Sequence, residues 1–100
     1  MTPINNNSII ALLRQELPAL KAKYPIHSLA LFGSYSRNEA TETSDIDLLV
    51  NFTHQQVGYE YLDLYFELQT LFGNKKIDLV TEGAIPAPYW QYIKNDLQYV

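Results

Sequence analysis

The sequence predicts one small α/β (α+β) domain, in which a mixed sheet of at least three strands packs against helices. Two observations lead to this prediction. Short apolar runs alternate along the chain with segments whose apolar residues recur at helical spacing. The chain has 100 residues, 47% hydrophobic and 18% charged, which suffices for one folded core. Residues 1–100 are therefore expected to form a single domain.

The first expected element is a helix that begins after Ser8, a good N-cap residue. Four apolar side chains recur on one face of this helix: Ile9, Leu13, Leu17 and Leu20. Pro18 lies inside the pattern and is expected to kink or break the helix, because proline lacks the amide hydrogen that the helix needs. Pro25 is expected to end it.

Three strands are expected in the middle of the chain, at about residues 26–32, 45–52 and 76–81. Gly33 and Ser34 are expected to start a turn and a short helix that carries Arg37, and residues 41–44 form a polar loop. A long helix is expected over residues 58–72, because it has a wide apolar face and is followed by Gly73 and Asn74. A final helix is expected from residue 88 to about residue 98.

Charge and composition exclude several classes of function. The net charge is −4 and the lysines and arginines are scattered, so we expect no direct binding of long nucleic acids. Binding of a nucleotide accompanied by magnesium is compatible with this net charge. Cysteine is absent, which excludes disulfides and thiolate metal sites. No signal peptide pattern or membrane-length apolar run is present, so a cytoplasmic protein is expected.

Three aspartates interrupt the apolar strands. Asp45 and Asp47 are two residues apart, so they should project from the same face of the second strand, while Ile46 and Leu48 point into the core. That aspartate side of the strand is expected to face water. Asp78 repeats the pattern in the third strand. Buried, unpaired carboxylates are costly, so we expect a divalent cation, Mg²⁺ or Mn²⁺, with Asp78 also able to accept a proton.

Gly33 and Ser34 are candidates for phosphate binding. Glycine allows a close approach of the backbone to a phosphate, and turn amides and the serine hydroxyl can donate hydrogen bonds to it. Arg37, about one turn further on, can neutralise phosphate charge. Taken singly, each feature is more often a plain turn, a solvated acidic residue or a surface charge. Their combination at this spacing predicts a nucleotide site.

The residues around these motifs also carry a family resemblance. The stretches LFGSYSRNEA, from Leu31, and SDIDLLV, from Ser44, resemble the minimal nucleotidyltransferase (MNT) subgroup of the superfamily that includes DNA polymerase β. The resemblance covers nearly the whole chain and implies the nucleotidyltransferase fold. It departs from the usual pattern at Asn38, where glycine is common. Asparagine tolerates a left-handed backbone, so we expect the turn to be kept.

The resemblance implies roles for the individual residues. Metal ligands are Asp45, Asp47 and Asp78, with Asp78 also the general base. Gly33 and Ser34 correspond to triphosphate contacts, and Arg37 to a phosphate or toxin contact. All three carboxylates are present, which favours an active member of the family.

Proteins of this family typically act beside a helical HEPN partner, often a ribonuclease toxin. The resemblance therefore implies an antitoxin that moves AMP from ATP to a tyrosine hydroxyl of the toxin, with magnesium, in a hetero-oligomer. One hundred residues leave no room for an acceptor domain, which also favours a protein partner. The alternative is a non-catalytic antitoxin that neutralises the toxin by binding and occlusion. Transfer to a small molecule is a weaker third possibility, for which no acceptor pocket is evident.

Aromatic side chains supply candidate anchors for such a partner, because tyrosine and tryptophan are favoured in protein interfaces. They lie in the long helix and in the final one, at Tyr59, Tyr61, Tyr65, Trp90 and Tyr92. For each ring, packing in the core is an equally good explanation.

Overall fold

The structure, a computed structural model, describes residues 4–54 and 58–100. In chain order its elements are α1 (Asn6–Lys23), β1 (Ile26–Phe32), α2 (Gly33–Ser36), β2 (Ile46–Phe52), α3 (Tyr59–Leu71), β3 (Ile77–Thr81), the 3₁₀ helix η1 (Glu82–Ala84), α4 (Ala87–Ile93) and β4 (Gln98–Tyr99). None of the helices in this part of the chain is long and apolar enough to cross a membrane.

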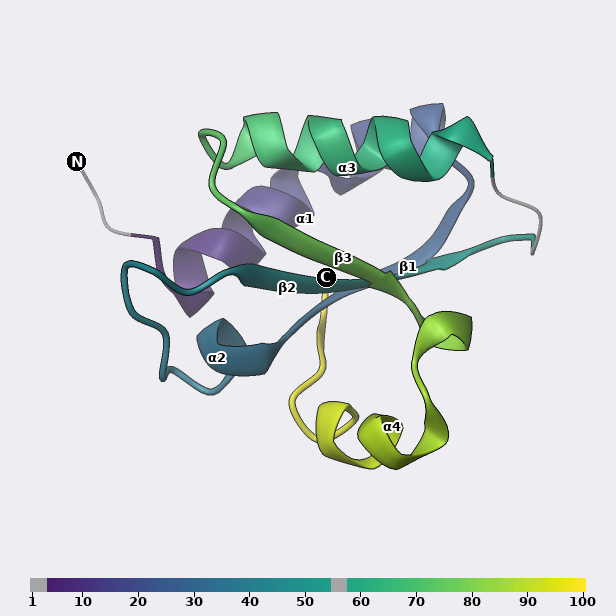
Figure 1. The fold of residues 1–100 in the computed structure, drawn as a ribbon. Coiled ribbons are helices and arrows are strands. Elements are labelled where there is room, and N and C mark those ends of the chain that lie inside the picture. The colour runs from purple at the N-terminus through teal and green to yellow at the C-terminus, as the bar shows by residue number, and fades with distance from the viewer. Residues whose placement is uncertain (1–3, 55–57) are drawn as a thin grey trace.

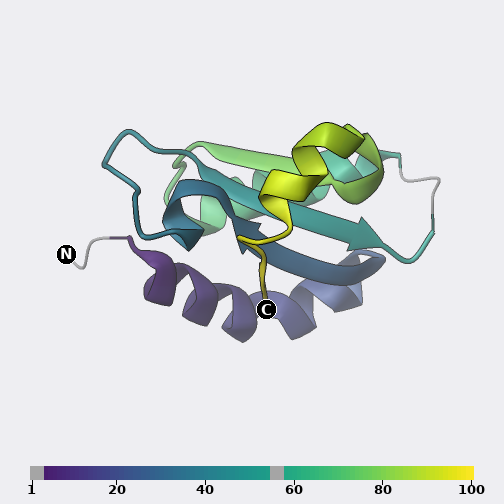
Figure 2. The same cartoon turned by 90° about the horizontal axis from the view of Figure 1, so that it is seen from below.

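The strands form one mixed sheet with the order β3-β2-β1-β4. Strand β1 pairs antiparallel with both β2 and β4, whereas β2 and β3 run parallel. Helices α1 and α3 cover one face of this sheet, and α2 and α4 lie on the other side (Figures 1 and 2). The predicted α/β class and mixed sheet are confirmed.

Two apolar clusters hold these layers together. The larger lies between the sheet and helices α1 and α3, and includes Ile46, Leu48 and Val50 from β2. The smaller lies on the opposite face, where Trp90 and the residues around it cover Leu49. The expectation that this side of β2 faces water is therefore wrong beyond Asp47, because Leu49 is buried beneath the segment after β3.

Helix α1 differs from the prediction at its start and at its proline. It begins at Asn6, because the side chain of Asn5 accepts from the backbone amide of Ser8, and the Ser8 hydroxyl accepts from the Asn5 amide. This capping box moves the cap three residues before Ser8. Pro18 does not break the helix. Its side chain is exposed, and the buried residues on either side of it, Leu13 and Leu20, keep the helix packed on the sheet.

The end of the chain also differs. The final helix ends at Ile93, and the predicted helical residues beyond it turn back toward the sheet. There Gln98 and Tyr99 form the short strand β4 beside β1, and the amide of Val100 donates to the carbonyl of Leu29 at 3.0 Å. Two-residue strands carry no readable alternation of apolar and polar side chains, so sequence pattern alone does not reveal them.

Candidate functional site

The parallel pairing of β2 and β3 places two of the three predicted aspartates side by side. Asp47 is the register partner of Asp78, and on its other side it is the partner of Phe32, the last residue of β1. Since side chains alternate along a strand and the flanking isoleucines and leucines are buried on the α1–α3 face, both carboxylates lie on the opposite face. The structure therefore brings Asp47 and Asp78 together at the turn that follows β1.

Gly33 lies directly against the Asp47 carboxylate. A Cβ atom at position 33 would be 2.1 Å from Oδ2 and 2.9 Å from Cγ of Asp47, closer than atoms can pack. The φ angle of Gly33 is +77°, a left-handed conformation that other residues rarely adopt. Glycine is thus required here for two independent reasons, and the turn and the carboxylate are packed as one unit.

The environment of Asp47 disfavours its negative charge. Burial, and then the negative charges of Asp78 and Asp45, raises the pKa of Asp47 to about 6, with a contact to the Asp78 carboxyl adding to the effect. Arg37 acts in the opposite direction through its positive charge. A carboxylate in such surroundings gains from any cation placed beside it, which is the electrostatic setting of a metal ligand or catalytic acid.

Asp45 is less well placed. It precedes β2, and its Oδ2 atom lies 3.7 Å from Nζ of Lys76. Within residues 4–54 and 58–100, no three acidic or histidine side chains are gathered closely enough to form a ready-made metal site. The donors nevertheless fit Mg²⁺ chemically, because it prefers hard carboxylate oxygens and keeps several of its waters. Asp47 and Asp78 fit as ligands, and Asp45 can join them if its side chain leaves Lys76.

The predicted phosphate-binding residues lie in and after the short helix α2. In the described part of the chain the Ser34 hydroxyl makes no hydrogen bond to protein, whereas that of Ser36 donates to the carbonyl of Asp96. Arg37 follows the helix and is half-exposed, with its guanidinium paired to Asp96 and Glu39. Ser34 is therefore available to a ligand, and Arg37 is already partly engaged.

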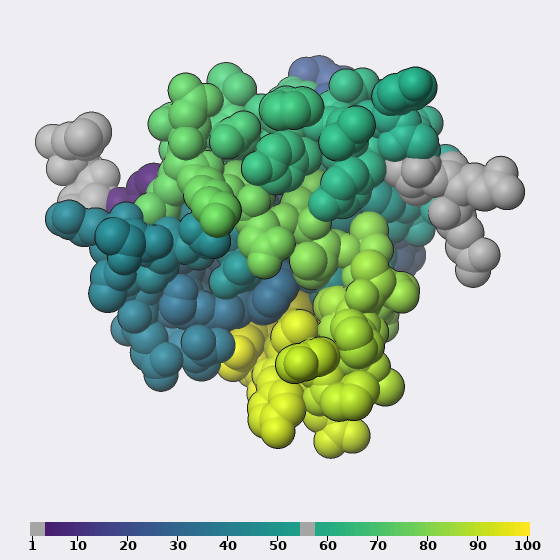
Figure 3. Space-filling model, in the orientation of Figure 1, coloured from purple at the N-terminus to yellow at the C-terminus, as the bar shows by residue number. Residues whose placement is uncertain are grey.

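The site opens to solvent on the face opposite α1 and α3. Figure 3 shows a depression there, between the segment after β1 and the green-to-yellow segment that begins with β3. A separate groove wraps around the end of the edge strand β3, and Asp78 borders it. The other lining residues come from β3, from the end of β2 and His54 beyond it, from η1 and from Tyr61 of α3.

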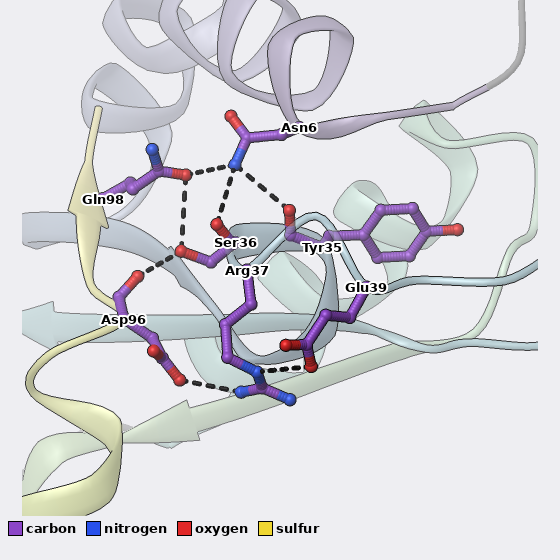
Figure 4. A network of polar contacts seen from close by, with 7 residues as sticks. All are labelled: Asn6, Tyr35, Ser36, Arg37, Glu39, Asp96 and Gln98. Atoms are coloured by element: carbon purple, nitrogen blue, oxygen red, sulfur yellow. Dashed lines mark hydrogen bonds and ion pairs between the residues drawn. The ribbon is translucent and has the colours of Figure 1, made fainter.

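The turn after β1 is held by residues that lie far from it in the sequence and that the sequence did not predict. Asn6, Asp96 and Gln98 contact it in the folded chain, yet none of them belongs to a motif (Figure 4). The prediction that Asn38 keeps a left-handed backbone in this turn is confirmed. This residue has a φ angle of 59°, in the left-handed region that favours glycine and that asparagine tolerates.

Comparison with known proteins agrees with this geometry. Residues 13–100 match the nucleotidyltransferase domain family. A chain of Methanocaldococcus jannaschii, named "putative protein adenylyltransferase", is 47% identical over 90 residues, which is 89% of this chain and 91% of the relative.

Two solved structures extend the likeness to three dimensions. A "putative minimal nucleotidyltransferase" has a TM-score of 0.79 at 26% identity, covering 98% of both chains. One chain of a solved complex, "tri-AMPylated Shewanella oneidensis HEPN toxin in complex with MNT antitoxin", matches with a TM-score of 0.57 at 25% identity, covering 95% of this chain and 67% of that one. The chain therefore belongs to the nucleotidyltransferase domain family, in the group of minimal nucleotidyltransferases whose solved members include antitoxins of HEPN toxins.

Proposed function

We propose that this chain is a magnesium-dependent protein adenylyltransferase that moves AMP from ATP to a tyrosine hydroxyl of a HEPN-type toxin. The observation that carries the proposal is the in-register pair of Asp47 and Asp78, packed against the left-handed Gly33. A tri-AMPylated toxin in the structurally similar Shewanella oneidensis complex supports the choice of reaction and partner.

Each residue has a distinct part in the proposed reaction. Asp47 and Asp78, joined by Asp45, would hold the cation, which when bound neutralises phosphate charge and aligns the reacting oxygens. The Ser34 hydroxyl and the amides of its turn would bind the triphosphate. The tyrosine oxygen then forms a bond to the α-phosphorus of ATP, the bond to the β-phosphate oxygen breaks, and pyrophosphate leaves. Asp78, which is exposed, would accept the tyrosine proton.

The groove around the end of β3 supports a protein-borne acceptor. It borders Asp78 and is open at the edge of the sheet, so an acceptor side chain has a route to the proposed general base. Tyr61 lines this groove, and its own hydroxyl donates to the carbonyl of Leu79. That hydrogen bond directs the Tyr61 hydroxyl to the β3 backbone, so the tyrosine that lines the groove is not free to act as the acceptor.

Binding without catalysis is the second candidate, favoured by the exposed aromatic side chains. Tyr59 on α3 is 82% exposed and Tyr92 on α4 is 77% exposed, so both are available to a partner. Tyr61 and Tyr65 pack instead against the main core, and Trp90 against the smaller cluster. A hetero-oligomer with a HEPN-type protein fits either candidate function.

The experiment combines the chain, a HEPN-type partner protein, ATP and Mg²⁺, and measures the intact mass of the partner. We expect additions of whole AMP groups to the partner and release of pyrophosphate. The variant Asp47→Asn with Asp78→Asn should still bind the partner but add no AMP. Asp63→Asn is the matched control, because it removes an exposed carboxylate of α3, the helix that covers the opposite face of the sheet from Asp47 and Asp78 (Figure 1).

Protection of cells from the toxin separates the two candidates. If the double variant protects as well as the unaltered chain, covalent transfer is not the mechanism and occlusion is. If it binds the partner but fails to protect, the transferase proposal holds. Peptide mapping of the modified partner then identifies the acceptor side chain.

A further inference from the structure

The four-residue helix α2 is held in place by side chains from distant parts of the sequence. Its last carbonyls, those of Tyr35 and Ser36, accept hydrogen bonds from the Asn6 side-chain amide at 3.1 and 3.3 Å. The same amide donates to Gln98, whose side-chain oxygen lies 3.4 Å from the Ser36 hydroxyl (Figure 4). A single helical turn is not stable alone, so these contacts fix its position.

Asp96 makes two contacts in this network. Its backbone carbonyl accepts from the Ser36 hydroxyl, and its carboxylate Oδ2 lies 2.8 Å from Nη1 of Arg37. Asp96 is itself well anchored, because its amide donates to the carbonyl of Ile93 at 2.9 Å and Leu97 packs in the smaller apolar cluster. Its side chain is 19% exposed, whereas that of Arg37 is 43% exposed. The rigid partner of this pair is therefore Asp96.

Arg37 keeps donors available after these contacts are made. Its Nε donates to Glu39 at 3.1 Å and its Nη1 to Asp96, while the other terminal nitrogen bonds to no residue that the structure describes (Figure 4). Arg37 also lies next to the turn that contacts Asp47, because its backbone amide donates to the carbonyl of Gly33 at 3.1 Å and Gly33 packs against the Asp47 carboxylate. The guanidinium is thus held at the edge of the candidate site with part of its donor set unused.

We propose that Asp96 is a positioning residue, which orients the Arg37 guanidinium for contact with the phosphates of a bound nucleoside triphosphate. The inference rests on the proposed function for the identity of the ligand. A side chain that is already oriented loses less freedom on binding, so the ligand binds more tightly than it would to a mobile arginine.

The competing explanation for the pair is electrostatic. An aspartate beside the site repels phosphate, so its removal alone should tighten binding. Glu39 provides the matched control, because it also pairs with Arg37 but is 66% exposed and only two residues away. Both Asp96→Asn and Glu39→Gln remove one negative charge next to the same guanidinium. Only Asp96→Asn removes the anchored partner.

The test is calorimetric titration of ATP with Mg²⁺ into the full chain at about 0.15 M salt, where surface charges are screened beyond about 8 Å. We expect Asp96→Asn to weaken binding by about five- to tenfold, a typical coupling for residues of one network. Glu39→Gln should bind as tightly as the unaltered chain or more tightly. Asp96→Glu should recover part of the loss, and melting temperatures of all variants establish that they are folded.

A double-variant cycle gives the decisive result. If Asp96 acts through Arg37, Asp96→Asn should weaken binding no further in a chain that already carries Arg37→Gln. Full additivity of the two changes overturns the proposal, as does a lower melting temperature for Asp96→Asn with unchanged affinity. Equal tightening by both charge variants, or no ATP binding by the unaltered chain, overturns it too. Coupled ATP binding without AMP transfer to the partner refutes the proposed function and leaves this inference standing.

Discussion

Replacing Asp47 with asparagine should stabilise the metal-free fold while it removes catalysis. Burial and the charges of Asp78 and Asp45 raise the pKa of Asp47 from its ordinary value of 3.8 to about 6. A tenfold change in an acidity constant corresponds to about 1.4 kcal/mol, so the full difference corresponds to about 3 kcal/mol of destabilisation at neutral pH. Asp47 is only half-buried. Solvent screening reduces the expected figure to about 1–2 kcal/mol.

The sign of the pH dependence follows from proton binding. Between pH 3.8 and about 6 the folded chain holds the Asp47 proton more tightly than the unfolded chain does. The contribution of Asp47 to the free energy of unfolding therefore falls as the pH rises through this window, and the penalty is complete above it. Asparagine carries no charge, so the advantage of the variant should be largest at pH 7.5 and vanish near pH 4.

Urea unfolding with a chelator present, at pH 7.5 and pH 4, measures this difference. Hydrogen bonds also lower the pKa values of Glu60 and Glu67, so stability depends on pH through other groups too, and only the difference between the two chains is informative. Asp63→Asn controls for the removal of any acidic charge. A variant no more stable than the unaltered chain at pH 7.5, or one with the same gain at both pH values, would refute the reasoning.

Substitutions at four further positions test the turn and helix α1. Gly33→Ala should abolish ATP binding and lower the free energy of unfolding by at least about 1–2 kcal/mol from its left-handed backbone alone. Ser34→Ala should only weaken ATP binding, as measured by calorimetry. Equal ATP affinities of the two folded variants would contradict the close contact of Gly33 with Asp47. Asn38→Gly should leave the midpoint of urea unfolding nearly unchanged, whereas Asn38→Val should lower the free energy of unfolding by about 1–2 kcal/mol. A valine variant as stable as the unaltered chain would show that the turn can rearrange. Pro18→Ala should raise the free energy of unfolding by about 1–3 kcal/mol by restoring a helical hydrogen bond. An unchanged free energy of unfolding would mean that the helix accommodates Pro18 without loss of stability.

The sequence pattern predicted the bounds of those elements whose apolar residues recur at a regular spacing. The first strand has the predicted bounds, and the other two long strands differ by one residue at their start, because buried strands with polar interruptions have few other interpretations. The sequence pattern did not predict features that depend on contacts between residues outside a repeat. The cap at Asn5 depends on a reciprocal hydrogen bond, and β4 exists only because β1 offers it an edge.

The site was predictable to a similar degree. The spacing of Gly33, Asp47 and Asp78 predicts their grouping, because adjacent strands place such residues at one position across the sheet. The pairing of Asp45 with Lys76 was not predictable, since it depends on the direction of two exposed side chains. Asp96 was also out of reach, because nothing in its local sequence indicates a contact 59 residues away.

The attachment of α2 to residues 96–98 has a consequence for the order of events during synthesis. The sheet strands that carry Asp47 and Asp78 are complete once residue 81 has been made. The contacts from Asp96 and Gln98 to the turn after β1 cannot form until about fifteen residues later. In a growing chain the strands of the acidic pair are therefore complete before the turn after β1 can be held in place by Asp96 and Gln98. Any activity that depends on a positioned Arg37 must await the emergence of residues 96–98.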